Sequence, residues 1–361
     1  MRILGRRDNS LPAPRILVDP ATDLEKEPMF HVRPAALAAL TVASVLAAQL
    51  PDSGALLVVT KQSHALAIVD GATLERAAAI PIGDDPHEVV VGPDHRTAYV
   101  TNYADASLRT MQRVDLVTHA QLAPIDIAPL RGAHGLFLHG TTLWFTAGGS
   151  NAIAGLDTAT GRIETVLGTG QDNTHMLWVS RDGNRIVASN AGSGTMSVFD
   201  RDLRPVSAQG ATSGWRHTLV PVRLGAEGFA VAPDEKTLWA GNRDGTITVV
   251  DLDAARAVTT FDAGVVGANR LAFTPDGRRV VVTTHAGKDL VVIDAATRAL
   301  VKRIPIEEHG ASGIQMEPGG RRVFIACPRD HFVAVVDLIK LERVATIDAG
   351  REPDGMTWWA R

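Results

Sequence analysis

A segment that recurs along most of the chain is the strongest constraint on its fold. Its first copy reads "PHEVVVGPDHRTAYVTN": an apolar segment, a Pro-Asp turn and a second apolar segment that ends at Asn102. The first segment returns as "AHGLFLH", "THMLWVS", "AEGFAVA", "ANRLAFT", "ASGIQME" and "PDGMTWW", at intervals of roughly 40–50 residues. This period predicts a propeller, because a small antiparallel sheet buries both faces only when copies stack around an axis.

The rest of each copy predicts three further strands. A turn such as "PDGRR" leads to a second strand such as "VVVTT", a third strand such as "VVIDA" that ends near an acid, and a fourth such as "RAVTTFD". Six copies are complete, and the seventh is split between "DGMTWWA" at the C-terminus and three segments near residues 55–82. We therefore predict an all-β, seven-bladed β-propeller over residues 52–361, with four antiparallel strands per blade. The C-terminal strand joins the N-terminal blade and closes the ring.

These segments also carry a family resemblance. "PHEVVVGPDHRTAYVTN" resembles the YVTN-type seven-bladed propeller repeat (one of the WD40/YVTN-like repeats) of surface-layer and exported bacterial proteins. The resemblance covers roughly residues 55–361. Similar propellers include lactonases of the phosphogluconolactonase type, the haem domain of cytochrome-type nitrite reductases and the copper-binding propeller of nitrous-oxide reductase. The motif is specific for the fold and weak for function.

The first 50 residues differ from the repeats. Residues 1–28 are polar, interrupted by Pro and without periodicity, so we interpret them as a non-native or disordered extension. Residues 29–48 have a basic start, a short apolar run and small residues at the end, which is the layout of a secretory signal peptide. We expect a periplasmic or secreted protein with no membrane span after signal removal. The alternative is an ordinary Ala-rich amphipathic helix.

Charge and cysteine content limit the partners. The chain has 36 Lys and Arg against 40 Asp and Glu, which leaves no basic footprint for nucleic acid. Cys327 is the only cysteine, so no intrachain disulfide forms, and we expect it to be a small buried residue. We expect a monomer that recognises a small molecule or a protein partner at the top face of the propeller.

Ligands of propellers bind on the axis, at the face where the inner strands begin. The second residue of each inner-strand segment is predicted to line this channel mouth, and all seven are polar or ionisable: His87, His134, His175, Glu227, Asn269, Ser312 and Asp354. The ends of the second strands predict another ring at the same mouth: Lys61, Asn102, Ala147, Asn190, Asn242, His285 and Cys327. The Asn residues of this ring are expected to bond the backbone of their own turns and cap them.

The three histidines occupy consecutive blades, which suggests a metal site. Imidazole suits Zn, Cu, Fe and Ni, and three His around an open position form a known catalytic arrangement. Glu227 or Asp354 would supply a fourth ligand or orient a ring. We therefore consider a divalent transition metal, Zn or Cu, on His87, His134 and His175. The alternative is structural, since His is common at this repeat position in YVTN-type propellers and can bond loop backbone.

Other candidate contacts lie outside the two rings. Trp215, Arg216 and His217 follow a long insertion in the blade that starts near residue 173, where a solvated hairpin is the favoured interpretation. Tyr103, Arg109 and Arg113 are expected near the top loop of the first complete blade.

Three functions fit the sequence. The first is an exported binding or scaffold propeller that recognises a small molecule, metal or protein at the channel mouth. The second is a metal- or haem-dependent periplasmic oxidoreductase, or its accessory protein. The third is a lactonase-type hydrolase with Glu227 or a histidine as general base. No catalytic residue is assigned from sequence.

Overall fold

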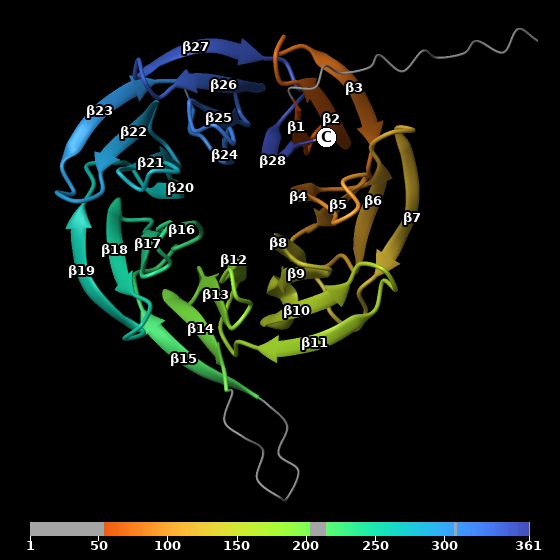
Figure 1. Ribbon diagram of the computed structural model, residues 1–361, viewed down its shortest axis with the longest axis horizontal. Coiled ribbons are helices and arrows are strands. Elements are labelled where there is room, and N and C mark those ends of the chain that lie inside the picture. Colours follow the sequence, from red (N-terminus) through yellow and green to blue (C-terminus); the bar gives the residue numbers. More distant parts are fainter. Residues whose placement is uncertain (1–53, 203–213, 307–308, 361) are drawn as a thin grey trace, which may run out of the picture. The chain divides into compact units, whose positions relative to one another are not determined.

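The computed structural model describes residues 54–202, 214–306 and 309–360. Its seven four-stranded antiparallel sheets form a ring around a central axis (Figure 1). The predicted all-β, seven-bladed fold is confirmed. The expected extension (1–28) and signal peptide (29–48) lie outside the described residues. Among the residues described, no helix is long and apolar enough to span a bilayer.

The strands follow the chain, four to a blade, and the described residues also include one short 3₁₀ helix. The first three complete blades are β4 (Pro86–Val91), β5 (Thr97–Asn102), β6 (Thr110–Asp115) and β7 (Ala120–Asp126); β8 (Ala133–His139), β9 (Thr142–Ala147), β10 (Ala152–Asp157) and β11 (Ile163–Gly168), with η1 (Gly148–Ser150); and β12 (Thr174–Val179), β13 (Arg185–Asn190), β14 (Thr195–Arg201) and β15 (Trp215–Pro221). The next three are β16 (Phe229–Val231), β17 (Thr237–Gly241), β18 (Thr246–Asp251) and β19 (Arg256–Asp262); β20 (Ala268–Phe273), β21 (Arg279–Thr284), β22 (Asp289–Asp294) and β23 (Leu300–Pro305); and β24 (Ile314–Met316), β25 (Arg322–Cys327), β26 (Phe332–Asp337) and β27 (Glu342–Ile347).

The seventh blade closes the ring as predicted. Its sheet has the order β28-β1-β2-β3, in which β28 (Pro353–Trp359) from the C-terminus pairs with β1 (Ala55–Thr60), followed by β2 (Ala65–Asp70) and β3 (Arg76–Pro81). Trp359 Nε1 donates a hydrogen bond of 2.8 Å to the carbonyl of His95 in the neighbouring blade. The C-terminal strand therefore fixes two blades at once.

The core lies between blades. Second strands are buried almost along their whole length, whereas outer strands such as β23 are mostly exposed. One apolar cluster joins Leu57 and Ile68 of the closing blade to Val100 and Val114 of the next. Each blade thus buries its two faces against its neighbours, and the polar mouth residues lie on a rigid frame.

A β-bulge at the start of the inner strand positions the mouth residues. Pro86 pairs with Asn102 and Val89 with Val100, so His87 and Glu88 together oppose Thr101 alone. Equivalent bulges interrupt β8, β12, β20 and β28. A bulge bends its strand and redirects side chains. In each of these five blades, two successive residues near the axis are thereby left outside the regular strand pairing.

A hydroxyl opposite the bulge links neighbouring blades, and we call this arrangement the hydroxyl clip. Thr146 Oγ1 accepts a hydrogen bond from Gly135 N at 2.8 Å and donates one of 2.6 Å to the carbonyl of His175 in the next blade. The same pair of bonds is made by Thr101, Ser189 and Thr283. The Thr of the "YVTN" motif therefore satisfies the backbone groups that the bulge leaves unpaired.

One of two expectations outside the mouth differs from the structure. Trp215, Arg216 and His217 belong to β15, the outer strand of their blade; Trp215 packs on Trp144 and His217 stacks on Phe199. β15 pairs antiparallel with β14, and Arg216 and His217 are exposed, so these residues belong to a hairpin with a solvated face, as the favoured interpretation expected. Arg113 lies on β6 and bonds the Ala123 carbonyl, away from the top loop that holds Tyr103 and Arg109.

Candidate functional site at the channel mouth

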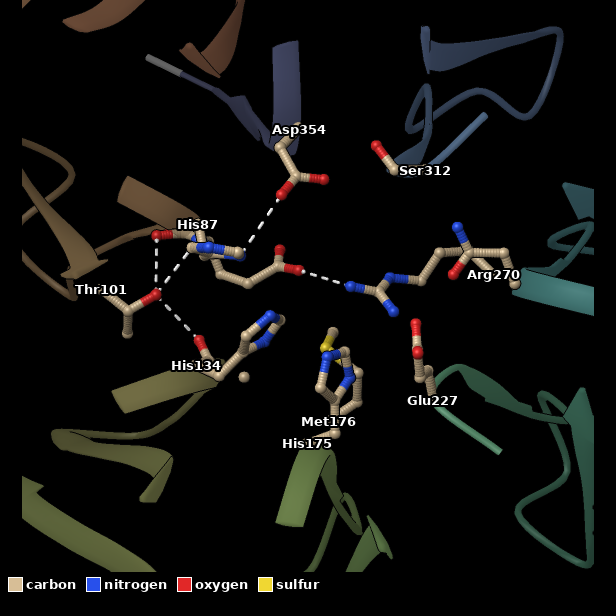
Figure 2. Close-up of polar contacts among 12 residues, drawn as sticks. His87, Thr101, His134, His175, Met176, Glu227, Arg270, Ser312 and Asp354 are labelled. Carbon is tan, nitrogen blue, oxygen red and sulfur yellow. Dashed lines mark hydrogen bonds and ion pairs between the residues drawn. The ribbon is translucent and has the colours of Figure 1, made fainter. Parts of the chain in front are cut away.

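The mouth ring comprises the seven residues predicted from the repeat, and its three histidines lie together. The ring centroids of His87 and His134 are 4.7 Å apart, and those of His134 and His175 are 3.9 Å apart (Figure 2). Tyr103, from the loop after β5, packs edge-on against both His87 and His134 at 5.2 Å. The bulges in three consecutive blades therefore produce one continuous histidine stack.

The stack contains unpaired polar atoms. Nδ1 of His87, His134 and His175 is buried in each case and has no hydrogen-bond partner among the described residues. His87 Nδ1 lies 3.4 Å from Asp354 Oδ2 without the geometry of a hydrogen bond. Buried polar atoms in native proteins are nearly always paired, so three such nitrogens side by side indicate a place for a ligand or bound water.

His134 and His175, the two more deeply buried histidines, are neutral at physiological pH. Burial, together with the positive charges of neighbouring groups, lowers the pKa of His134 and His175 well below 6.5. A neutral imidazole is the form that coordinates a metal or accepts a hydrogen bond.

Carboxylates flank the stack on one side. His87 Nε2 lies 3.2 Å from Asp85 Oδ2, and Asp354 Oδ2 lies 3.2 Å from Lys61 Nζ. Burial opposes the ionisation of Asp354, but the charges of Lys61, His87 and Arg270 outweigh it and hold the pKa of that carboxyl below its usual 3.8. Asp354 is thus an ionised, buried acceptor between a lysine and the outermost histidine.

Glu227, Asn269 and the backbone carbonyl of Ser312 have partners of their own. Glu227 Oε2 lies 3.6 Å from His285 Nε2, on the side of the ring remote from His87. Asn269 donates to the carbonyl of Ala311 in the next blade, and the carbonyl of Ser312 accepts from Thr283. Asn269 is therefore structural, while Glu227 and His285 form a separate polar pair.

The second predicted ring needs two corrections of register. Pro353 pairs with Thr60 and Ala268 with Thr284, so these two threonines, not Lys61 and His285, are equivalent to Asn102. Lys61 and His285 come one residue later, where the loops carry them over the mouth. The cause of the error is that comparing the repeats with one another does not establish which residues pair across two strands.

The strand-end Asn residues also differ from expectation. Asn102 bonds the carbonyl of Asp84, in the connection that enters its blade, and Asn190 and Asn242 bond hydroxyls on the third strand. Asn102 thus holds the connection that enters its blade, whereas Asn190 and Asn242 link the second and third strands across their own turns through side chains, without the predicted bond to the turn backbone. Cys327 is fully buried in an apolar cluster, as expected.

Sequence analysis missed an ion pair across the axis. Arg270 Nη2 from β20 lies 3.2 Å from Glu88 Oε1 of β4, and both side chains are largely buried (Figure 2). Burial raises the pKa of Glu88, and the positive charge of Arg270 partly offsets this. Each member of the pair comes one residue after a mouth-ring residue, and the pair joins β4 and β20 across the axis.

The repeat contained a sequence pattern from which the Glu88–Arg270 pair could have been predicted. The residue after the mouth-ring residue is Gly in four blades: Gly135, Gly228, Gly313 and Gly355. A Cβ at Gly228 would lie 2.2 Å from the carbonyl oxygen of Asn269, and one at Gly313 would lie 2.1 Å from that of Asp354. Glycine is the rule there for steric reasons, and the three exceptions, Glu88, Met176 and Arg270, are the side chains that fill the axis.

The histidines do not form a metal site as they stand. No group of three His, Cys, Asp or Glu side chains in the described part of the chain is placed to hold a metal ion. The imidazoles are tilted against their neighbours, at 52° between His87 and His134 and at 34° between His134 and His175. The Zn or Cu site on His87, His134 and His175 stays a prediction.

The fold and the mouth define a seven-bladed propeller whose axis opens at a histidine stack. Residues 224–315 match the model of the Cytochrome D1 heme domain family. A stretch of 105 residues is 31% identical to the Dihydro-heme d1 dehydrogenase of Pseudomonas aeruginosa, covering 29% of this chain and 20% of that protein. The aligned stretch thus spans only a fifth of that relative, and the chain's resemblance to the YVTN-type family stays a prediction.

Solved structures share the fold over most of the chain. A functionally unknown protein from Desulfotomaculum acetoxidans DSM 771 superposes with a TM-score of 0.69 at 13% identity, over 85% of this chain and 99% of that one. Hydrazine synthase from Kuenenia stuttgartiensis gives a TM-score of 0.61 at 17% identity, over 75% and 88%. At such low identity these structures show the propeller architecture alone.

Proposed function

We propose that the protein is a binding propeller for a haem-type tetrapyrrole, held at the channel mouth with an imidazole of the histidine stack as iron ligand. The observation that carries the proposal is the set of three adjacent histidines whose Nδ1 atoms are buried and unpaired among the described residues. Iron accepts imidazole nitrogen, and His is a common haem ligand.

The chemistry of the mouth supports this ligand. His134 and His175 are neutral, so no proton competes for their nitrogens at neutral pH. Asp85 and Asp354 lie against His87, and a carboxylate partner orients a coordinating imidazole and makes it more basic. Tyr103 adds an aromatic edge beside the stack. When bound, the tetrapyrrole would supply iron redox chemistry, while the chain's own residues bind and orient it.

The partial matches favour a tetrapyrrole over other small molecules. Both matched relatives carry haem d1 in their names, although the family match at residues 224–315 includes Glu227 and His285 and not the histidine stack. The proposal therefore concerns binding, and an oxidoreductase or accessory role would follow from it. No observation favours a lactonase-type hydrolase, since Glu227, its expected base, lies against His285.

Spectroscopic titration tests the proposal. The full chain is titrated with haemin and, separately, with extracted haem d1. We expect saturable binding with one equivalent and an absorption shift typical of imidazole ligation. His87→Ala, His134→Ala and His175→Ala are compared with His139→Ala, a control far from the mouth whose ring contacts the carbonyl of Arg181. At least one mouth variant should lose the imidazole spectrum and regain it with added free imidazole.

Several results would count against the proposal. Absence of saturable binding for both haems would overturn it, as would mouth variants that all bind like the parent. Calorimetric titration with Zn²⁺ and Cu²⁺ on the same variants tests the metal hypothesis. If the parent binds a metal ion saturably, the histidine variants do not, and neither haem binds, then the ligand of the mouth is a metal ion and not a tetrapyrrole.

Export is part of the same proposal. A periplasmic or secreted location rests on the signal-like layout of residues 29–48. N-terminal sequencing of native protein should give a start near Ala48 or Gln49. A cytoplasmic protein that begins at Met1 would contradict it.

A further inference from the structure

The opposite end of the axis holds a cavity that the mouth does not use. We call it the axial funnel; its volume is about 560 Å³, within the usual range for ligand pockets. Its wall comes mainly from the inner strands and is somewhat more apolar than polar, with Val91, Leu138, Ile314, Met356 and Trp358 forming its apolar part. Its lining reaches the exposed His95 in the β4–β5 turn and the exposed Ala360, so the funnel opens at the face remote from the histidine stack.

The closed end of the funnel carries a hydrogen-bond donor. A smaller cavity of about 110 Å³ shares Glu88, Met176, Ile314 and Met356 with the funnel and is also lined by Arg270. Arg270 Nη2 is bonded to Glu88, but Nη1 is buried and has no hydrogen-bond partner among the residues described. Guanidinium has five donors and no acceptor, so Nη1 requires an oxygen or similar acceptor to be satisfied.

The charges of Glu88 and Arg270 at the closed end of the funnel favour a neutral hydrogen-bond acceptor over an anionic one. Glu88 lies 3.2 Å from the Arg270 guanidinium and already balances its charge, with both side chains little exposed. A second carboxylate here would be repelled by Glu88 and would lose its hydration without a free cation to compensate it. A carbonyl or hydroxyl oxygen satisfies Nη1 without this penalty.

From this geometry we infer that the axial funnel binds a neutral, elongated apolar molecule whose terminal carbonyl or hydroxyl oxygen accepts a hydrogen bond from Arg270 Nη1. The apolar body lies along Ile314, Met356 and Trp358, and the oxygen lies at the Glu88–Arg270 pair. This site does not depend on the tetrapyrrole proposal, because none of the residues that line the two cavities belongs to the mouth ring.

Tryptophan fluorescence and calorimetry of the full chain at pH 8 test this inference. The probes are decan-2-one, decan-1-ol, decanoate and decane. We expect saturable binding of the ketone and the alcohol, with a change in Trp emission because Trp358 lines the funnel. Decanoate and decane should bind at least 10-fold more weakly, which corresponds to the loss of a buried hydrogen bond or to charge repulsion of about 1.4 kcal/mol or more.

Two variants identify the site. Glu88→Met combined with Arg270→Met removes the donor and its counter-charge together, adds no new donor, and should abolish the preference for ketone over decane. Ile314→Trp should fill the funnel and block all the probes. Arg279→Met serves as a matched control, because Arg279 is a partly buried arginine on β21 that bonds the carbonyl of Leu338 outside the funnel. Thermal melts establish that each variant is folded.

The outcomes separate clearly. Equal affinity for decane and the ketone would overturn the role of Arg270, and stronger binding of decanoate would overturn the neutral head group. No saturable binding of any probe, or unchanged binding in Ile314→Trp, would overturn the site itself. Haemin binding by the mouth should be unaffected by Ile314→Trp, so failure of either proposal is recognised independently of the other.

Discussion

Thr146→Val is the most direct test of how the mouth is built. Thr146 is fully buried, and its hydroxyl makes both bonds of the hydroxyl clip, from Gly135 N at 2.8 Å and to the carbonyl of His175 at 2.6 Å. Valine has nearly the same shape, so the substitution removes the hydroxyl and leaves a backbone N–H and a backbone carbonyl buried without partners. Each such group costs about 1–3 kcal/mol, so the two groups together predict a loss of about 2–6 kcal/mol in the free energy of unfolding.

Thr146→Ser is the matched variant. It keeps the hydroxyl and removes one buried methyl, which costs about 1 kcal/mol. Unfolding in guanidinium chloride, followed by Trp fluorescence, should rank the proteins as parent, then Ser, then Val. The Gly135 amide, bonded to Thr146 instead of the strand ladder, should exchange hydrogen faster in the Val variant. If Val proves as stable as Ser, or the Gly135 amide stays equally protected, the clip does not hold the bulge and our account is wrong.

Three further predictions concern pH, sterics and closure. Folding depresses the pKa values of His134 and His175, so the unfolded chain binds their protons first as the pH falls below 6.5. The free energy of unfolding of the parent should therefore fall by up to about 1.4 kcal/mol per pH unit for each histidine. His134→Gln should flatten this slope in melts between pH 8 and 5, and an unchanged slope would contradict the argument. Gly228→Ala should destabilise strongly, since its Cβ would meet the Asn269 carbonyl at 2.2 Å, whereas Gly168→Ala, with open space around it, should not; equal melting temperatures would refute the steric argument. Deletion of residues 354–361 removes most of β28 and the Trp359 bond to His95, so the truncated chain should aggregate; a soluble product that melts like the parent would disprove the closure.

The candidate site was only partly predictable. The repeat placed His87, His134 and His175 at equivalent positions of consecutive blades, and the propeller geometry then brought them together. The repeat did not give the strand register, by which Thr60 and Thr284, and not Lys61 and His285, occupy the position in their blades that Asn102 occupies in its own. Register depends on which backbone groups pair, and a bulge shifts that pairing without changing the apolar pattern.

The sequence by itself determined the architecture, because four short apolar strands per repeat bury their faces only in a closed ring, and seven copies were countable, the split one included. The tertiary structure alone decided the chemistry along the axis. Glu88 and Arg270 are 182 residues apart and meet only because two bulged strands face each other across the ring. The unpaired nitrogens of the histidine stack have the same origin, since burial and hydrogen bonding at the axis depend on side chains from several blades, and a pattern within one repeat contains no information about those neighbours.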